Sequence, residues 1–239
     1  MLYIPKNQRR PMLIVGFFGA LLFAVGDVLL QSFSGEGETL LLILNSSLRD
    51  MPLWKLYFTL LSGVIATPAL FFGLSAMDSY LTDTGGISKG RMHRWFRFGA
   101  VTASLSFFAA HAVCAVLELS LRQALVSGLT PGEANAAFQV PFLLSFAATN
   151  VWVTASEIVL SVSFISFVVR GAVPLKKACA WLNTIGVTVI FEILGALLSG
   201  LTGNGVFSLL AKSGPSLGVG AMLLGMMAAC GKESEEDRR

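Results

Sequence analysis

The chain has 239 residues, of which 54% are hydrophobic and only 13% are charged. An ordinary soluble domain carries about 25% charged residues, so this composition excludes a disordered chain, a nucleic-acid-binding module and most soluble enzyme folds. The formal net charge of +3 does not indicate a polyanionic partner, because the basic residues stand in short clusters between long apolar stretches. That distribution is typical of a multi-pass membrane protein.

The uncharged runs predict an all-α fold, a polytopic bundle of six transmembrane helices in a single domain over residues 1–239. About 20 apolar residues cross a bilayer, which sets the predicted spans at about 12–30, 53–81, 95–121, 131–169, 177–201 and 213–230. Thr130 to Glu133 form a capping box before the fourth span. Pro141 is expected to kink that span, leaving about 145–169 as the crossing. Residues 31–52 are expected to be an outer loop with a re-entrant or interfacial helix.

Lysine and arginine predict the direction of the chain. With both termini in the cytoplasm, the inner segments hold 13 of these residues and the outer segments hold 4, which accounts for all 17. The four outer residues are Arg49, Lys55, Arg122 and Lys212. Basic loops of membrane proteins stay on the cytoplasmic side, so we expect cytoplasmic termini and an external 31–52 loop.

Ionisable residues within the spans are the main functional signal. Asp27, His111, Glu157 and Glu192 come from four different helices and share a depth slightly outward of the midplane, at about 1.5 Å per residue. Each such group costs at least about 2.5–3.5 kcal/mol at mid-bilayer, and no lysine or arginine lies deep in any span. The carboxyl groups must therefore be protonated, share a proton, pair with His111 or face water. We interpret these four residues as candidate catalytic groups.

Helical periodicity places further polar residues on the faces that carry Glu157 and Glu192. One stripe consists of Asn150, Thr154, Glu157 and Ser161, and the other of Thr184, Thr188, Glu192 and Ser199. Lipid-facing surfaces are apolar, so both stripes are expected to face the interior of the bundle. The candidate substrate-binding residues are Asn150, Thr154, Thr188, Trp152 and Glu118.

Two other acidic residues have simpler interpretations. Glu118 lies four residues before Arg122, the spacing of an exposed ion pair on a helix. Asp78 lies near the inner boundary, where it is expected to contact water or headgroups. The three cysteines, Cys114, Cys179 and Cys230, lack metal-ligand or redox spacing, so neither a metal site nor a cofactor is predicted.

Four local sequences suggest a relationship to a known family. They are Gly26-Asp27-Val28-Leu29-Leu30, Ala110-His111-Ala112, Arg170-Gly171-Ala172-Val173-Pro174 and Trp181-Leu182-Asn183. Over nearly the whole chain, the sequence resembles an uncharacterised family of bacterial multi-pass integral membrane proteins, a domain of unknown function. The resemblance implies the topology and a bacterial inner-membrane location, but no activity. That family has a proline where Thr184 stands and a Phe-Asn pair where Pro215-Ser216 stand, which argues against a functional role for Asn183 and for the start of the sixth helix.

A more distant similarity connects the chain with emopamil-binding-type sterol isomerases, which are small helical membrane enzymes. The similarity is carried by the order along the chain of His111, Glu118, Glu157 and Asn183. It is an analogy of residue types on helices. It implies acid–base chemistry on a hydrophobic substrate within the membrane.

The sequence leaves three functions open. The first is binding or acid–base processing of a lipid-like hydrophobic substrate. The second is a proton-coupled transporter or channel, and the third is a non-catalytic membrane assembly subunit. The expected partners are membrane lipid and a small hydrophobic ligand, without nucleic acid. A site closed to both aqueous sides but open to lipid favours the first function, whereas a continuous polar path favours the second.

Overall fold

The computed structural model describes residues 1–30, 47–83, 90–203, 207 and 212–236, and these residues form helices and no strand. Six helices are long and apolar enough to cross a membrane. They are α1 (Lys6–Leu30), α3 (Leu53–Asp83), α4 (Arg91–Val126), α5 (Pro131–Val169), α6 (Thr184–Thr202) and α8 (Gly214–Glu236). The predicted all-α fold with six spans is confirmed. Two short elements are α2 (Ser47–Asp50) and the 3₁₀ helix η1 (Lys177–Trp181).

Capping residues set the first residues of α5 and α6, and the predicted start was correct for α5 but not for α6. The Thr130 hydroxyl accepts from the Glu133 backbone N–H, and the Glu133 carboxylate accepts from the Thr130 N–H, so the capping box is formed. The helix then continues through Pro141 to Val169 as one element, and the kink at Pro141 with a crossing from about residue 145 stays a prediction. The predicted fifth span starts seven residues later than expected, because Asn183 caps α6 by accepting from the Gly186 N–H at 3.0 Å.

The predicted outer loop is only partly visible. Residues 31–46 lie outside the described residues, so the expected re-entrant or interfacial helix is not tested there. Residues 47–50 form the single turn α2. The backbone carbonyl of Met51, just after that turn, accepts from Arg122 Nε at 2.8 Å, which fixes the start of α3 against α4.

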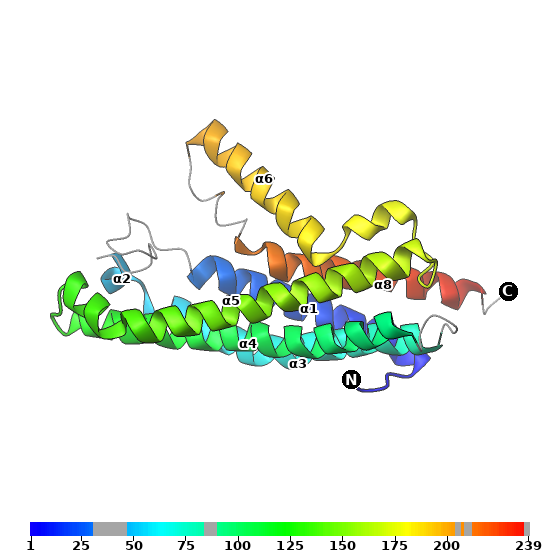
Figure 1. The fold of residues 1–239 in the computed structure, drawn as a ribbon, viewed down its shortest axis with the longest axis horizontal. Coiled ribbons are helices and arrows are strands. Elements are labelled where there is room, and N and C mark those ends of the chain that lie inside the picture. Colours follow the sequence, from blue (N-terminus) through cyan, green and yellow to red (C-terminus); the bar gives the residue numbers. More distant parts are fainter. Residues whose placement is uncertain (31–46, 84–89, 204–206, 208–211, 237–239) are drawn as a thin grey trace.

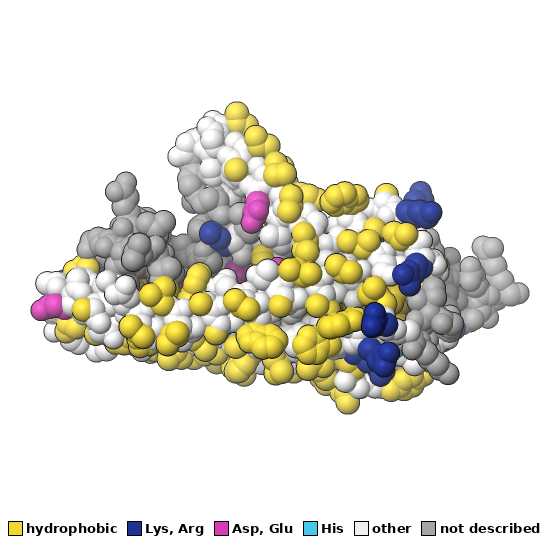
Figure 2. Space-filling view, viewed as in Figure 1, with side chains coloured by type: hydrophobic (Ala, Val, Ile, Leu, Met, Phe, Trp, Pro, Cys, Tyr) yellow, Lys and Arg dark blue, Asp and Glu magenta, His cyan; other side chains and the backbone are white. Residues whose placement is uncertain are grey.

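Five of the long helices run side by side along the long axis of the molecule, and α6 leaves this bundle at an angle (Figure 1). The packed pairs are α1 with α3 and α8, α3 with α4, and α4 with α5. α1 begins and α8 ends at the same end of the bundle (Figure 1). Lysine and arginine side chains gather at that end (Figure 2). We call it the basic end and the opposite end the distal end.

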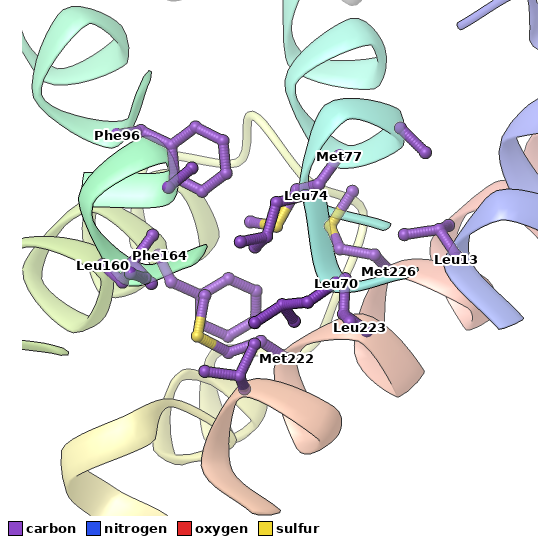
Figure 3. Close-up of a cluster of buried hydrophobic side chains, with 14 of the residues drawn as sticks. Leu13, Leu70, Leu74, Met77, Phe96, Leu160, Phe164, Met222, Leu223 and Met226 are labelled. Carbon is purple, nitrogen blue, oxygen red and sulfur yellow. The ribbon is translucent and has the colours of Figure 1, made fainter. Parts of the chain in front are cut away.

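The main core lies in the half of the bundle nearer the basic end. Its apolar side chains come mainly from α1, α3, α4, α5 and α8 and pack against one another (Figure 3). They include Leu13, Leu70, Leu74, Met77, Phe96, Leu160, Phe164, Met222, Leu223 and Met226. α1 and α3 approach closely at Gly16 and Gly73, where a Cβ on Gly16 would lie 2.5 Å from the Gly73 Cα. A second, smaller apolar cluster at the distal end joins Leu48 and Met51 to Leu121, Leu125 and Phe142.

Candidate functional site

His111 is held in a fixed position deep within the bundle. Its side chain is 2% exposed, and the ring lies 4.6 Å from the Phe23 ring between centroids. Glycines provide the space for the imidazole. A Cβ on Gly26 of α1 would lie 3.0 Å from His111 Nε2, and a Cβ on Gly63 of α3 would lie 3.0 Å from the His111 Cβ. Larger residues at these two positions would push the ring out of place.

Both ring nitrogens of His111 face hydrogen-bond acceptors. Nδ1 lies 2.9 Å from the carbonyl oxygen of Phe107, one turn earlier on α4. Nε2 lies 3.1 Å from the carbonyl oxygen of Phe23 and 3.3 Å from Asp27 Oδ1. A carbonyl oxygen can only accept, so each nitrogen makes a good contact only when it carries a hydrogen. The geometry therefore places His111 and Asp27 close enough to share a proton.

Asp27 links His111 to the start of α8. Its Oδ1 faces the imidazole, and its Oδ2 accepts from the Ser216 hydroxyl at 2.7 Å. The Asp27 side chain is 19% exposed, which makes it the accessible edge of the cluster. The sequence reasoning discounted the start of the sixth span, and the partner of Asp27 comes from there. A separation of 189 residues gives no local signal for this contact.

The order of these contacts excludes Ser216 as the nucleophile of a Ser-His-Asp triad. A nucleophilic serine is activated by a hydrogen bond to histidine, which is in turn oriented by the acid. Here the Ser216 hydroxyl donates to Asp27, and the carboxylate stands between the serine and the imidazole. Ser216 therefore orients the acid. The cluster is arranged to hold a proton and a charge pair, not to form a covalent intermediate.

Glu157 on α5 adds a carboxyl group with no partner. The residue is 8% exposed, and its Oε1 is buried without any hydrogen bond among the described residues. One turn further on, the Ser161 hydroxyl lies 2.8 Å from the Thr184 hydroxyl, where α6 begins. The Thr184 hydroxyl also lies 3.4 Å from the backbone carbonyl of Glu157. Glu157 therefore lies next to the base of α6.

Glu118 corrects an expectation drawn from its spacing. It is 3% exposed, its Oε2 has no hydrogen bond among the described residues, and Arg122 instead donates to the Met51 carbonyl. The exposed Glu118–Arg122 ion pair is therefore wrong, because the α2–α3 junction covers this side of α4. Glu118 lies seven residues, about two turns, beyond His111 on α4.

The remaining candidates lie outside the buried cluster. Thr188 is half-buried at the contact between α6 and α8, where a Cβ on Gly214 would lie 2.9 Å from the Thr188 Cα. Glu192, farther along α6, is exposed and is not brought to Asp27, His111 or Glu157. Asn150, Trp152 and Thr154 on α5 are exposed as well.

The exposure of Asn150 and Thr154 has a geometric cause. They belong to the same helical face as Glu157 and Ser161, which are buried. α6 covers this face only near Ser161 and then departs from the bundle (Figure 1). The space-filling view shows both acidic and basic side chains near the place where α6 diverges (Figure 2). We call the region between the diverging parts of α5 and α6 the wedge. Its narrow end is marked by the Thr184 hydroxyl, which lies 3.4 Å from the Glu157 backbone carbonyl.

A separate polar cluster near the basic end was not predicted. Asp78 of α3, 2% exposed, lies 2.6 Å from His93 Nε2 and accepts from Arg97 Nε at 2.8 Å and Nη2 at 3.0 Å. The expectation that Asp78 contacts water or headgroups is therefore wrong. His93 and Arg97 are four residues apart on the helix that follows α3, and this spacing was the signal that could have revealed the cluster. Asp83 similarly pairs with the buried Arg9.

Metal binding has no support from these geometries. No group of three or more histidine, cysteine, aspartate or glutamate side chains is arranged to hold a metal ion within the described part of the chain. The candidate site is thus the Asp27–His111–Ser216 cluster, and the bundle also holds two buried carboxyl groups, Glu157 and Glu118.

Comparison with protein families matches residues 5–233 to a Family of unknown function (DUF6796). The chain belongs to this family. Because the match covers nearly the whole chain, α1 to α8 and the cluster at Asp27 and His111 are all parts of the DUF6796 unit. Neither the curated proteins nor the solved structures contain a match to the chain.

Proposed function

We propose that this DUF6796 protein binds a lipid-like amphiphile in the wedge between α5 and α6. The observation that carries the proposal is the Asp27–His111–Ser216 cluster together with Glu157, which lies where α6 diverges and whose buried Oε1 has no hydrogen bond among the described residues. A buried polar atom without a partner costs about 1–3 kcal/mol. A ligand whose polar group reaches Glu157 would remove this cost.

The walls of the wedge suit an amphiphile. The α5 wall presents the exposed polar side chains of Asn150 and Thr154. Beyond Thr188, α6 carries many exposed apolar side chains, among them Ile190 and Ile193. Most well-formed ligand sites combine an apolar lining with a few convergent polar groups. A polar headgroup would lie near Asp27 and Glu157, and an apolar chain would extend along α6 into lipid.

A channel or proton-coupled transporter has less support from this arrangement. The polar cluster at His111 and the one at Arg97 are separated by 14 residues of α4, or about 21 Å. The buried α4 side chains between them include apolar Ala103 and Phe107, at most 3% exposed, and the hydroxyls of Ser104 and Ser106. The apolar side chains of the main core in this part of the bundle favour lateral access over a polar path toward the basic end (Figure 3). A non-catalytic assembly subunit would not require the unpartnered Glu157.

Acid–base processing of the ligand is a further step of the same proposal. The Asp27–His111 pair holds a proton between a carboxylate and an imidazole, and Asp27 is the exposed member. General acid–base catalysis requires a reacting atom within about 2.6–3.2 Å of the group that exchanges the proton. Asp27 is the group that a ligand in the wedge would reach.

The orientation and location belong to this proposal as well. We propose that the basic end faces the cytoplasm, because lysine and arginine side chains gather there (Figure 2) and the predicted inner segments hold 13 of the 17 such residues, the bias typical of cytoplasmic segments. The proposed location is the inner membrane of a bacterium, as the family resemblance implies. In this orientation, the Asp27–His111 cluster lies in the outer half of the bilayer.

The test is to identify lipid that co-purifies with the full-length protein, using native mass spectrometry after extraction in neutral detergent. Thr154→Trp fills the α5 wall of the wedge and should remove the bound species. Val162→Trp introduces the same side chain at an exposed α5 position that lies about 80° farther around the helix from Glu157 than Thr154 does. This variant should retain the bound lipid. Equal retention in both variants, or no bound species in the parent protein, would contradict binding in the wedge.

A further inference from the structure

We infer that an exposed face near the start of α4 binds an anionic membrane phospholipid through its phosphate. This face, which we call the arginine face, consists of Arg94, Trp95, Arg97, Phe98 and Leu105. The inference is independent of binding in the wedge, which lies between α5 and α6. It follows from the order of charged and apolar side chains along one side of α4 and from the way in which Arg97 is held.

The five side chains share one side of the helix. At about 100° per residue, Phe98 and Leu105 lie within about 40° of Arg94 around the helix axis. Trp95 and Arg97 flank this line at about 100° on one side and about 60° on the other. Arg94 is exposed, the Arg97 side chain is 51% exposed, and the exposures of Trp95, Phe98 and Leu105 are 50%, 50% and 61%. This side of α4 is therefore open to the surroundings of the bundle.

The arginine face changes from charged to apolar over the length of one lipid. Arg94 and Arg97 lie near the basic end, and Leu105 follows Arg94 by eleven residues, or about 16 Å along the axis. Trp95 lies at the arginine level, and tryptophan is enriched where a helix passes the lipid headgroups. A phospholipid beside a spanning helix has the same order, with its phosphate at the surface and its acyl chains deeper. The apolar part of the face therefore favours a lipid over a soluble acidic partner.

Asp78 fixes the guanidinium of Arg97 at the edge of this face. Its carboxylate accepts from Arg97 Nε at 2.8 Å and from Nη2 at 3.0 Å. Asp78 itself is 2% exposed, so the pair is anchored in the bundle. These two bonds leave the N–H groups of Nη1 outside the pair. A guanidinium that is already held in one orientation loses little freedom when it binds a phosphate, so Asp78 is a positioning residue for Arg97.

Arg94 supplies the charge that the Arg97–Asp78 pair lacks. It forms no ion pair within the described part of the chain, where Asp78 pairs with Arg97 and Asp83 pairs with Arg9. Arg94 and Arg97 are three residues apart, which makes them neighbours on the helix surface. Arginine binds phosphate oxygens with directed, charge-assisted hydrogen bonds. One uncompensated positive charge beside a fixed donor selects a lipid with a net negative charge over a zwitterionic lipid with the same phosphate.

The experiment is a competition between phosphatidylglycerol and phosphatidylcholine with identical acyl chains. Both are added in equal amounts to the full-length protein in neutral detergent, and native mass spectrometry gives the ratio of the two bound lipids. A basic residue near a membrane surface strengthens anionic lipid binding by about fivefold. With the directed donors of Arg97 added, we expect phosphatidylglycerol to be favoured by at least about tenfold. Equal binding of the two lipids would overturn the inference.

Variants then locate the binding residues. Arg94→Gln should fold normally, because Arg94 is exposed, and should lower the ratio by about fivefold. Arg49→Gln removes an exposed arginine on α2, at the distal end, and should leave the ratio unchanged. Arg97→Gln should also lower the ratio, but it takes from Asp78 its arginine partner. If Arg97→Gln does not fold, Arg94→Gln decides, and a ratio equal to that of the parent would overturn the inference.

Two further measurements separate this lipid from a soluble anion and from a ligand in the wedge. Glycerol phosphate, which has the phosphate without acyl chains, should not displace phosphatidylglycerol even in large excess; displacement would assign the face to a soluble anion and overturn the inference. Selectivity for phosphatidylglycerol should survive Thr154→Trp, and its loss there would place the lipid in the wedge and overturn this inference alone. If selectivity survives Thr154→Trp and no other bound species is lost, binding in the wedge fails and the arginine face stands.

Discussion

Replacing Glu118 with leucine should stabilise this protein, although it removes a buried charged residue. Glu118 is 3% exposed, and its Oε2 has no hydrogen bond among the described residues. Leaving a buried polar atom unpaired costs about 1–3 kcal/mol. Leucine has a similar length and places apolar atoms against a side of α4 already lined by Leu121 and Leu125. The free energy of unfolding should therefore rise by about 1–3 kcal/mol.

The measurement is the melting temperature of the purified protein in one detergent. For a chain of this length, 1 kcal/mol corresponds to about 2–4 °C, so Glu118→Leu should melt about 2–12 °C higher than the parent. Two controls bracket the result. Glu118→Gln keeps the unpaired polar atoms and should change the melting temperature by less than about 2 °C. Leu121→Ala creates a cavity in the same cluster and should lose about 2–5 kcal/mol. A fall in melting temperature for Glu118→Leu would refute the reasoning, since it would mean that the carboxyl group makes favourable contacts.

Three further predictions test other parts of the structure. Asp78→Asn leaves Arg97 and His93 without their counter-charge and should lower the free energy of unfolding by about 3 kcal/mol. This is the lower limit for breaking a buried pair, and it applies because the Arg97 side chain is 51% exposed. A melting temperature equal to that of Asp50→Asn, which removes an exposed acid on α2, would contradict the prediction. Nitrogen NMR of histidine-labelled protein should show both ring nitrogens of His111 protonated, with the signals assigned by their loss in His111→Gln; a bare ring nitrogen would show that the imidazole is neutral. Single cysteines at Ser127 and Lys176, in a protein without its native cysteines, should react with an impermeant thiol reagent from opposite sides of the membrane. Reaction from one side would contradict the six-span topology.

The sequence predicted the spans well because a bilayer imposes one strong requirement on every crossing helix. Runs without charge had to coincide with helices, and the α5 bounds agree with the predicted 131–169. The depth calculation also brought Asp27, His111 and Glu157 to one layer, because the rise per residue of a helix is fixed. These inferences depend on single helices. They required no knowledge of how helices pack.

Contacts between helices that are far apart in the sequence could not be predicted from it. The Ser216–Asp27 hydrogen bond joins α8 to α1, and neither residue has a pattern that identifies the other. The departure of α6 depends on where small residues permit close approach. Gly218 and Gly214 of α8 contact Thr184 and Thr188 near the start of α6, and the rest of the helix is left free to diverge. Glu192 was expected beside Glu157, and this divergence is the reason that it is exposed.

Unequal helix lengths also affect the lipid around this protein. α5 has 39 residues and is about 58 Å long, whereas α6 has 19 and is about 28 Å long, against a hydrocarbon thickness of about 30 Å. α5 keeps apolar side chains exposed beyond that thickness, with Val140 at 64% and Leu144 at 68% exposure. A bilayer adapts to such a hydrophobic mismatch by thickening, or the helix adapts by tilting. α6 requires neither, so α5 and α6 place different demands on the lipid beside them. The long helix must tilt or deform the bilayer, whereas the short helix matches the hydrocarbon thickness as it stands.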